Sequence, residues 1–281
     1  MENPAIEILL AAMIWGTTGV FIKYLNLPPT TINFFRLAIP AIFLYIFLKA
    51  KRVKLWNINT NTIIFISAIN AIRLLLYFYA YTLTSIGNAL IILYTWPIFA
   101  SIFGFIILKE KMNLRKVSFL FLAFTGIVVT FSGSSFSLQS KDFIGMGAML
   151  VSAVLYALTI PLFKKELEKC SNYEAVFYQN FIGAFIFLPF FLFSRPWPHF
   201  WQFNIAIIYA FLIGIIGFSL FFAGLKRLST TASSLLTYAE VISGLVFGWI
   251  FFRQPITIEM VIGGILILLS SYFIRISEKI I

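Results

Sequence analysis

The sequence predicts an all-α integral membrane protein with ten transmembrane helices, arranged as two inverted repeats of five helices. Three observations support this prediction. The chain of 281 residues is 61% hydrophobic and 11% charged, whereas a soluble globular protein is about one quarter charged. Its apolar segments have the length of about 20 residues that crosses a hydrocarbon layer of about 30 Å. The two halves of the chain also repeat one another.

Hydropathy in windows of about 20 residues places ten spans along the chain. The expected ranges are 6–24, 31–49, 63–83, 89–108, 117–133, 144–163, 173–193, 204–225, 230–252 and 257–276. Most connections between them are short, and no hydrophilic block is long enough for a separate soluble domain. The chain is therefore expected to lie almost entirely within the membrane.

The basic residues predict the orientation of these spans. With the N-terminus inside, the cytoplasmic loops and tail carry 15 Lys and Arg residues, and the outer side carries four. Because positive charge concentrates on the cytoplasmic side, we expect a multi-pass protein of the cytoplasmic membrane with both termini in the cytoplasm. The net charge of +11 then reflects topology and contact with anionic lipid headgroups. It does not require a nucleic-acid partner.

Internal similarity indicates a duplication. Shifting the chain by 144 residues pairs four positions of the fourth span and its end with the ninth: Tyr94 with Tyr238, Gly104 with Gly248, Lys109 with Arg253, and Glu110 with Gln254. Shifting it by 141 pairs Trp15 with Tyr156, Thr18 with Thr159, and Lys23 with Lys164. Each unit has an odd number of spans, so the second unit inserts upside down relative to the first. The expected repeats are 1–133 and 144–281, joined by the polar segment 133–142.

Two opposite charges fall near the middle of predicted spans, Arg73 in the third and Glu240 in the ninth. An ionised side chain at this depth is costly unless it is paired or faces water, so such residues are candidates for function. In the functional interpretation, Arg73 binds an anionic substrate group and Glu240 binds an amine or a proton. In the alternative, the two form a structural ion pair, or backbone carbonyls neutralise Arg73. Protonation of Glu240 could couple transport to the proton gradient, whereas a permanently ionised Glu240 would only pair with Arg73.

Further polar and aromatic residues lie at similar depth or share a helical stripe with these charges. They are Trp15, Thr18, Asn70, Tyr77, Tyr94, Trp96, Tyr156, Thr159 and Thr237. For any one aromatic residue, packing in the core or against lipid is the alternative, because Phe, Trp and Tyr make up 19% of the chain. Several of them around one cavity would suit a flat or cationic ligand. Pro97 removes a backbone donor, so the carbonyl it exposes could contact substrate or let the helix flex.

Other ionisable residues are expected to be structural. Arg36 lies about 9 Å from the outer end of its span, at about 1.5 Å per residue, so we expect it to reach the interface as an anchor, with substrate binding as the alternative. Glu7 is expected to be solvated or to act as a helix-start charge, and His199 to lie on the surface. Cys170 is the single cysteine, which excludes an internal disulfide and argues against a thiolate metal cluster.

Taken together, these features resemble the EamA-type permeases of the drug/metabolite transporter superfamily. The resemblance rests on the ten spans, on Trp15-Gly16-Thr17, on Arg36, and on the segment from Ala89 to Lys116 with Pro97 and Glu110. It covers residues 6–276, although the second copy has Val241 and Gln254 where the family usually has Pro and Glu. It implies export or exchange of amino acids and other small metabolites. It also implies a central cavity lined by the first, third, fourth, sixth, eighth and ninth spans.

The sequence therefore predicts a secondary transporter that exports amino acids or related amine-bearing solutes by alternating access. The alternative is a multidrug or amphiphile exporter, or a lipid-linked flippase, which an open, Phe-rich groove facing lipid would favour. An enzyme is not expected, since one histidine and ten acidic residues, mostly in loops, supply no catalytic cluster. The expected partners are a small solute and membrane lipids, without cofactor or metal. The oligomeric state is open, and a monomer is compatible with the sequence.

Overall fold

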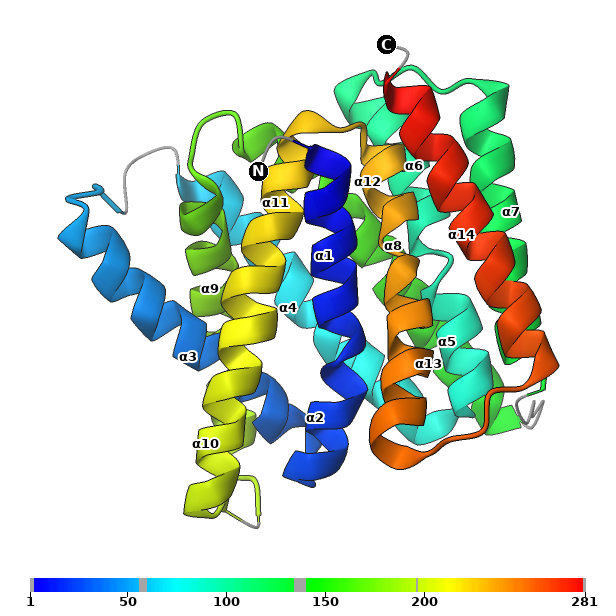
Figure 1. Ribbon diagram of the computed structural model, residues 1–281. Helices are drawn as coiled ribbons and strands as arrows, with labels where there is room; N and C mark the ends of the chain where they lie inside the picture. Colours follow the sequence, from blue (N-terminus) through cyan, green and yellow to red (C-terminus); the bar gives the residue numbers. More distant parts are fainter. Residues whose placement is uncertain (1–2, 56–59, 134–139, 196, 280–281) are drawn as a thin grey trace.

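The structure is a computed structural model that describes residues 3–55, 60–133, 140–195 and 197–279, and the regular elements in these ranges are all helical (Figure 1). Ten segments there are long and apolar enough to cross a membrane. They are Pro4–Leu25, Pro29–Ala50, Thr60–Leu83, Asn88–Leu108, Leu114–Phe131, Asp142–Glu166, Asn172–Leu192, Phe200–Arg227, Thr230–Phe252 and Ile258–Ser277. The all-helical fold and the ten expected spans are thus confirmed. Most of the predicted joint between the halves, residues 134–139, lies outside the described residues.

Six of the spans are continuous helices, and four are interrupted. The continuous helices are α3 (Pro29–Ala50), α4 (Thr60–Leu83), α7 (Leu114–Phe131), α8 (Ser140–Glu166), α9 (Asn172–Leu192) and α14 (Ile258–Lys279). The interrupted spans are α1 (Pro4–Gly16) with α2 (Thr18–Leu25), α5 (Ile86–Leu93) with α6 (Trp96–Leu108), α10 (Phe200–Tyr209) with the π-helix η1 (Ala210–Gly217) and α11 (Phe218–Arg227), and α12 (Thr230–Leu236) with α13 (Ala239–Phe252). Irregular backbone at this depth is tolerated where protein buries it or where it lines a cavity.

The spans of the two halves pack against each other in corresponding pairs. Helix α4 packs on α8, and its counterpart in the other half, α11, packs on α1. Likewise α6 packs on α8, and α13 packs on α1. Helix α3 also packs on α9, and α7 packs on α14, and the helices of each of these pairs correspond to each other. This exchange of partners is consistent with inverted repeats related by a twofold axis.

Local backbone features recur at the spacing of 144 residues. Lys109 caps the C-terminal end of α6 and Arg253 caps that of α13, and both residues have a left-handed backbone, with φ of 53° and 49°. In each case the next residue closes the helix in the same way. The N–H of Glu110 donates to Gly104 O, and the N–H of Gln254 donates to Gly248 O, each at 3.3 Å. Gly104 and Gly248 therefore each supply the carbonyl that accepts the bond closing the last turn of the helix.

The interruptions of the fourth and ninth spans meet inside the bundle. The hydroxyl of Tyr238 donates to the carbonyl of Tyr94 at 2.7 Å. That carbonyl has lost its usual helical donor, because the N–H of Ile98, next to Pro97, turns to Thr95 O at 3.0 Å. A side chain of the opposite half therefore occupies the carbonyl of Tyr94, whereas the carbonyl from which Pro97 itself withholds a helical donor is that of Leu93, four residues earlier.

Polar contacts join the spans at the end of the bundle where α1 begins and α14 ends, here called the terminus-bearing end (Figure 1). Lys164 Nζ lies 2.6 Å from Glu110 Oε1, and Glu110 Oε2 accepts the N–H of Thr230 at 2.7 Å. Glu7 lies in the first turn of α1, as expected for a helix-start charge, but it is not solvated. It is 5% exposed and forms an ion pair with Arg227, which the end of α11 brings against it.

Candidate functional site

Two adjoining cavities lie among the spans, with volumes of about 190 and about 350 Å³. They share a wall, and we treat them together as the central cavity. The residues common to both are Trp15, Thr18, Ile22, Tyr77, Leu93, Tyr94 and Glu240. The larger cavity alone falls within the range of roughly 300–1,000 Å³ that small-molecule sites occupy.

The central cavity opens at the end of the bundle opposite the terminus-bearing end, here called the opposite end. Lys23 and Gln254 line it there, and both are exposed. Towards the terminus-bearing end, the apolar side chains of Ile8, Phe163 and Phe222 are no more than 1% exposed. The rings of Phe163 and Phe222 pack with centroids 5.1 Å apart. Packed core therefore closes the way to the terminus-bearing end.

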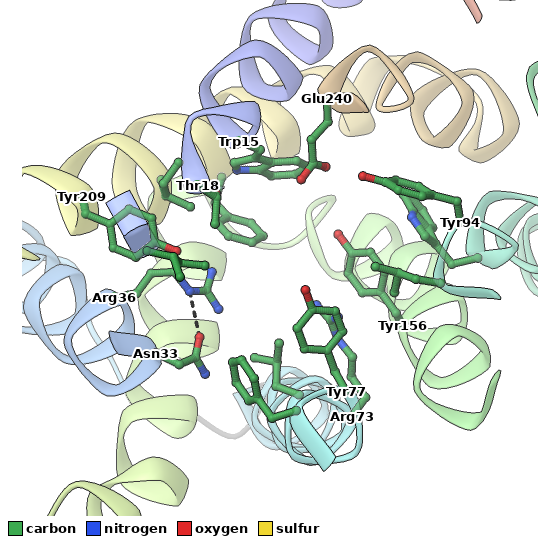
Figure 2. Close-up of a pocket in the computed structure, with 17 residues that line it drawn as sticks. Trp15, Thr18, Asn33, Arg36, Arg73, Tyr77, Tyr94, Tyr156, Tyr209 and Glu240 are labelled. Carbon is green, nitrogen blue, oxygen red and sulfur yellow. Dashed lines mark hydrogen bonds between the residues drawn. The ribbon is translucent and has the colours of Figure 1, made fainter. Parts of the chain in front are cut away.

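Arg73 and Glu240 face the central cavity from opposite sides (Figure 2). Arg73 belongs to α4, and Glu240 lies in the first turn of α13. Among the ion pairs of the described residues, none joins these two side chains within 4.0 Å. The structural ion pair considered as the alternative is thus not formed. Two opposite charges held apart across a cavity can each contact a different group of one solute.

Neighbouring side chains fix Arg73 at the cavity wall. Its Nε donates to Asn70 Oδ1 at 3.1 Å, and the guanidinium carbon lies 3.9 Å from the centroid of the Tyr156 ring. Such a stack stabilises a guanidinium through the negative face of the ring. Of the hydrogen bonds in the described part of the chain, none uses the two terminal nitrogens of Arg73. Those nitrogens are the donors left for a solute.

Aromatic side chains form most of the remaining wall. The rings of Trp96 and Tyr156 pack with centroids 4.7 Å apart, and those of Trp15 and Phe218 with centroids 4.9 Å apart. Gly217 at the end of η1 allows Trp15 to take this place, because a Cβ there would lie 2.6 Å from the indole nitrogen. The wall is therefore rigid and suited to stacking or cation–π contact.

The structure brings most of the predicted site residues to one place. Lining the central cavity are Trp15, Thr18, Arg73, Tyr77, Tyr94, Trp96, Tyr156 and Glu240. Asn70, Thr159 and Thr237 are not among the lining residues. Asn70 instead holds Arg73, whereas the hydroxyls of Thr159 and Thr237 donate to carbonyls three residues earlier, at 2.7 and 2.6 Å. Such local bonds turn a threonine towards its own helix.

Sequence reasoning missed the contribution of the second span. Asn33 and Arg36 from α3 line the central cavity, and so do Tyr209 and Phe218 from the eighth span. Arg36 was expected to reach the interface as an anchor, but the packing of α3 against η1 turns it inward. A signal was available, because the spacing Asn-x-x-Arg occurs at Asn33 and Arg36 and again at Asn70 and Arg73. In both cases the arginine Nε donates to the asparagine, at 2.9 and 3.1 Å.

Comparison with known proteins places this arrangement in context. The model of the EamA-like transporter family matches residues 4–132 and 143–276. The uncharacterized transporter YoaV of Bacillus subtilis is 23% identical over 277 residues, covering 95% of this chain and 94% of that protein. The pseudopaline exporter CntI of Pseudomonas aeruginosa is 24% identical over 292 residues, covering 99% and 98%. A solved crystal structure shares the fold with a TM-score of 0.81 and 19% identity, covering 96% of this chain and 98% of the other.

Proposed function

Because this chain belongs to the EamA-like transporter family, whose members are transporters and not enzymes, we propose that it exports amino acids or related amine-bearing solutes by alternating access. The family and the ten apolar helices make it a multi-pass membrane protein of the drug/metabolite transporter superfamily. One of the relatives of this chain, CntI, is an exporter. The nature of the solute, the direction of transport and the orientation in the membrane belong to the proposal.

One observation carries the choice of solute. Arg73 and Glu240 line the same cavity from opposite sides and do not pair with each other. A zwitterion would satisfy both at once, with its carboxylate on the terminal nitrogens of Arg73 and its ammonium on the carboxylate of Glu240. Charge-assisted hydrogen bonds of this kind are the strong ones in binding sites. An uncharged solute would leave both charges without a partner.

The two ends of the cavity support the alternating-access part of the proposal. The central cavity opens at the opposite end, and packed side chains close the terminus-bearing end. The excess of basic residues in the loops of the terminus-bearing end favours a cytoplasmic location for that end and for both termini. In this orientation, the present conformation faces outward. Release of an exported solute would occur from it, and a second conformation would load the solute from the cytoplasm.

The aromatic wall favours a second candidate function. Phe78, Phe218 and four tyrosines line the same cavity, and such a wall also suits a flat organic cation. A multidrug or amphiphile exporter would use Glu240 for the cation and would have no need of Arg73. The role of Arg73 therefore separates the two candidates.

The proposal is tested first by binding. A ligand that binds only the folded protein raises its melting temperature, by an amount corresponding to about 2.7 kcal/mol at one hundred times the Kd. We expect purified protein to be stabilised by amino acids, and less by nucleosides or cationic drugs. Arg73→Gln should abolish stabilisation by amino acids. Stabilisation by cationic drugs alone, unchanged in Arg73→Gln, would favour the second candidate.

Transport provides the second test. We expect Arg73→Ala to abolish amino-acid transport, with a loss of at least about 100-fold, because a carboxylate loses its charge-assisted bonds and Glu240 loses its partner across the solute. Membrane abundance should be unchanged. Arg195→Ala is the matched control, since Arg195 is exposed in the loop after α9. Equal transport by Arg73→Ala and wild-type protein at equal abundance would refute the proposed site.

Proton coupling through Glu240 is a separate part of the proposal. If Glu240 carries the proton, Glu240→Gln should abolish uphill flux driven by a pH gradient but retain exchange of solute across the membrane. The measurement is transport in vesicles with and without an imposed gradient. Uphill flux of the wild-type protein that does not depend on pH would exclude this role and leave exchange or facilitated diffusion.

A further inference from the structure

We propose that Arg36 and Asn33 form a second anion subsite, so that the preferred solute carries two anionic groups in addition to an amine. This inference rests on the proposed function and specifies its substrate class. Three ionisable side chains line the smaller cavity, Arg36, Arg73 and Glu240. Figure 2 shows them at three corners, with Arg36 on the left, Arg73 at the lower right and Glu240 at the top. A zwitterion with one carboxylate can pair with only two of these three side chains.

Arg36 is held in place but not neutralised. Its Nε donates to Asn33 Oδ1 at 2.9 Å, and its guanidinium carbon lies 5.8 Å from the centroid of the Phe218 ring. The ring is near the limit of about 6 Å for cation–π attraction, and the amide is neutral. Among the ion pairs of the described residues, none involves Arg36. Its terminal nitrogens are therefore available to a solute.

Asn33 provides an independent sign of an incomplete site. Its side chain lines the cavity and is 4% exposed. The oxygen accepts from Arg36, whereas the amide nitrogen is buried and, within the described part of the chain, has no hydrogen-bond partner. A buried donor without a partner is costly and uncommon in native proteins. An anionic group bound by Arg36 could accept a hydrogen bond from this nitrogen as well.

The transport cycle strengthens the requirement for a second anion. In the present conformation the cavity opens to water, which can solvate Arg36. When the cavity closes around its solute, that water is lost, and a buried arginine without a counter-charge is strongly unfavourable. Glu240 is the only acidic residue that lines the central cavity, so within the described residues it is the only internal counter-charge. The solute must therefore bring one negative charge for each arginine.

The second subsite predicts a preference between solutes that differ by a single charge. We expect acidic amino acids to bind more tightly than the amides of the same shape, with L-aspartate, L-glutamate and L-2-aminoadipate compared with L-asparagine, L-glutamine and the monoamide of aminoadipate. The best acid should exceed its amide by at least about tenfold, since one hydrogen-bonded ion pair contributes on that order. Binding is measured by titration calorimetry or by the shift in melting temperature.

Substitution of Arg36 should remove this preference without abolishing binding. In Arg36→Gln, we expect the acid and its amide to bind equally, at the affinity that the amide has for wild-type protein. Asn33→Leu should reduce the preference in part, and Arg195→Gln, in an exposed loop, should leave it unchanged. Arg36→Lys should retain part of the preference, because it keeps the charge but loses the guanidinium geometry.

The outcomes distinguish this inference from the proposed function. If acids and amides bind wild-type protein equally at all three chain lengths, the second subsite is refuted and the proposed function stands. If Arg36→Gln weakens acids and amides by the same factor, or lowers the melting temperature without ligand while the preference persists, Arg36 is structural and the inference is refuted. If none of the six ligands binds and Arg73→Gln changes nothing, the proposed function fails as well.

Discussion

The two ends of the bundle carry corresponding residues that make different contacts. At the terminus-bearing end, Lys164 of α8 pairs with Glu110 after α6 at 2.6 Å. Their counterparts in the repeat are Lys23, which lies in the second half of α2, and Gln254, which follows α13. Among the described hydrogen bonds none joins Lys23 to Gln254, and the Lys23 ammonium lies 4.3 Å from the centroid of the Phe252 ring instead. One end has a salt bridge where the other has an open cavity.

This difference indicates which conformation the sequence favours. Glu110 also accepts hydrogen bonds from the N–H and the hydroxyl of Thr230, at 2.7 and 3.0 Å, so a single carboxylate links α6, α8 and the start of α12. Gln254 is neutral and could offer only a neutral amide to Lys23 if the opposite end closed. Charge-assisted bonds are about twice as strong as neutral ones. The substitution of one acid by its amide thus biases the protein towards closure at the terminus-bearing end.

The largest effect is expected from removing the charge at the closed end. Glu110→Gln should shift the equilibrium by about 10- to 100-fold away from closure there, because hydrogen bonds to charged groups contribute about 1.5–3 kcal/mol. The shift is measured as faster maleimide labelling of Leu236→Cys, a side chain that is 1% exposed in the closed end. Glu168→Gln is the control, since Glu168 is exposed nearby. Unchanged labelling would show that packing alone closes this end.

A smaller effect is expected from adding a charge at the open end. Gln254→Glu should pair with Lys23 when that end closes and so favour closure by up to about fivefold, the range of a solvent-exposed salt bridge. Labelling of Thr18→Cys, which lines the central cavity, should slow accordingly. The effect should vanish when Lys23→Met is added, and Gln254→Met should not reproduce it. If slowing persists without Lys23, the two positions do not form a gate.

Cys170 is not expected to affect closure at either end of the bundle or to react appreciably with maleimide. The labelling experiments can therefore be carried out in protein that retains this cysteine. Burial, with the nearby carboxylates of Glu174 and Glu166, raises the pKa of the Cys170 thiol to about 12. Only the thiolate reacts, so labelling at pH 7.5 should be about a thousandfold slower than for an ordinary thiol of pKa about 8.5. The rate should rise about tenfold per pH unit until the pH approaches the pKa. Rapid labelling of wild-type protein at pH 7.5 would contradict this, as would altered labelling of either reporter in Cys170→Ser.

The sequence alone determined the spans, the central charges and the correspondence between the halves. Hydropathy is a local property with the length scale of the bilayer, so the ten spans could be predicted to within a few residues. Arg73 and Glu240 stood out because ionised groups are rare at that depth. Shared positions such as Lys109 and Arg253 could be matched by their spacing, and their backbone conformations agree.

Only the tertiary structure decided which polar residues face the central cavity. The rotation and lateral position of a helix depend on how it packs against its neighbours, which no single span encodes. Packing against η1 turned Arg36 inward, although its depth in the span also suited an interfacial anchor. Bonds within their own helices turned Thr159 and Thr237 away. Contacts between residues far apart in the chain also joined Glu7 to Arg227 and closed one end while leaving the other open.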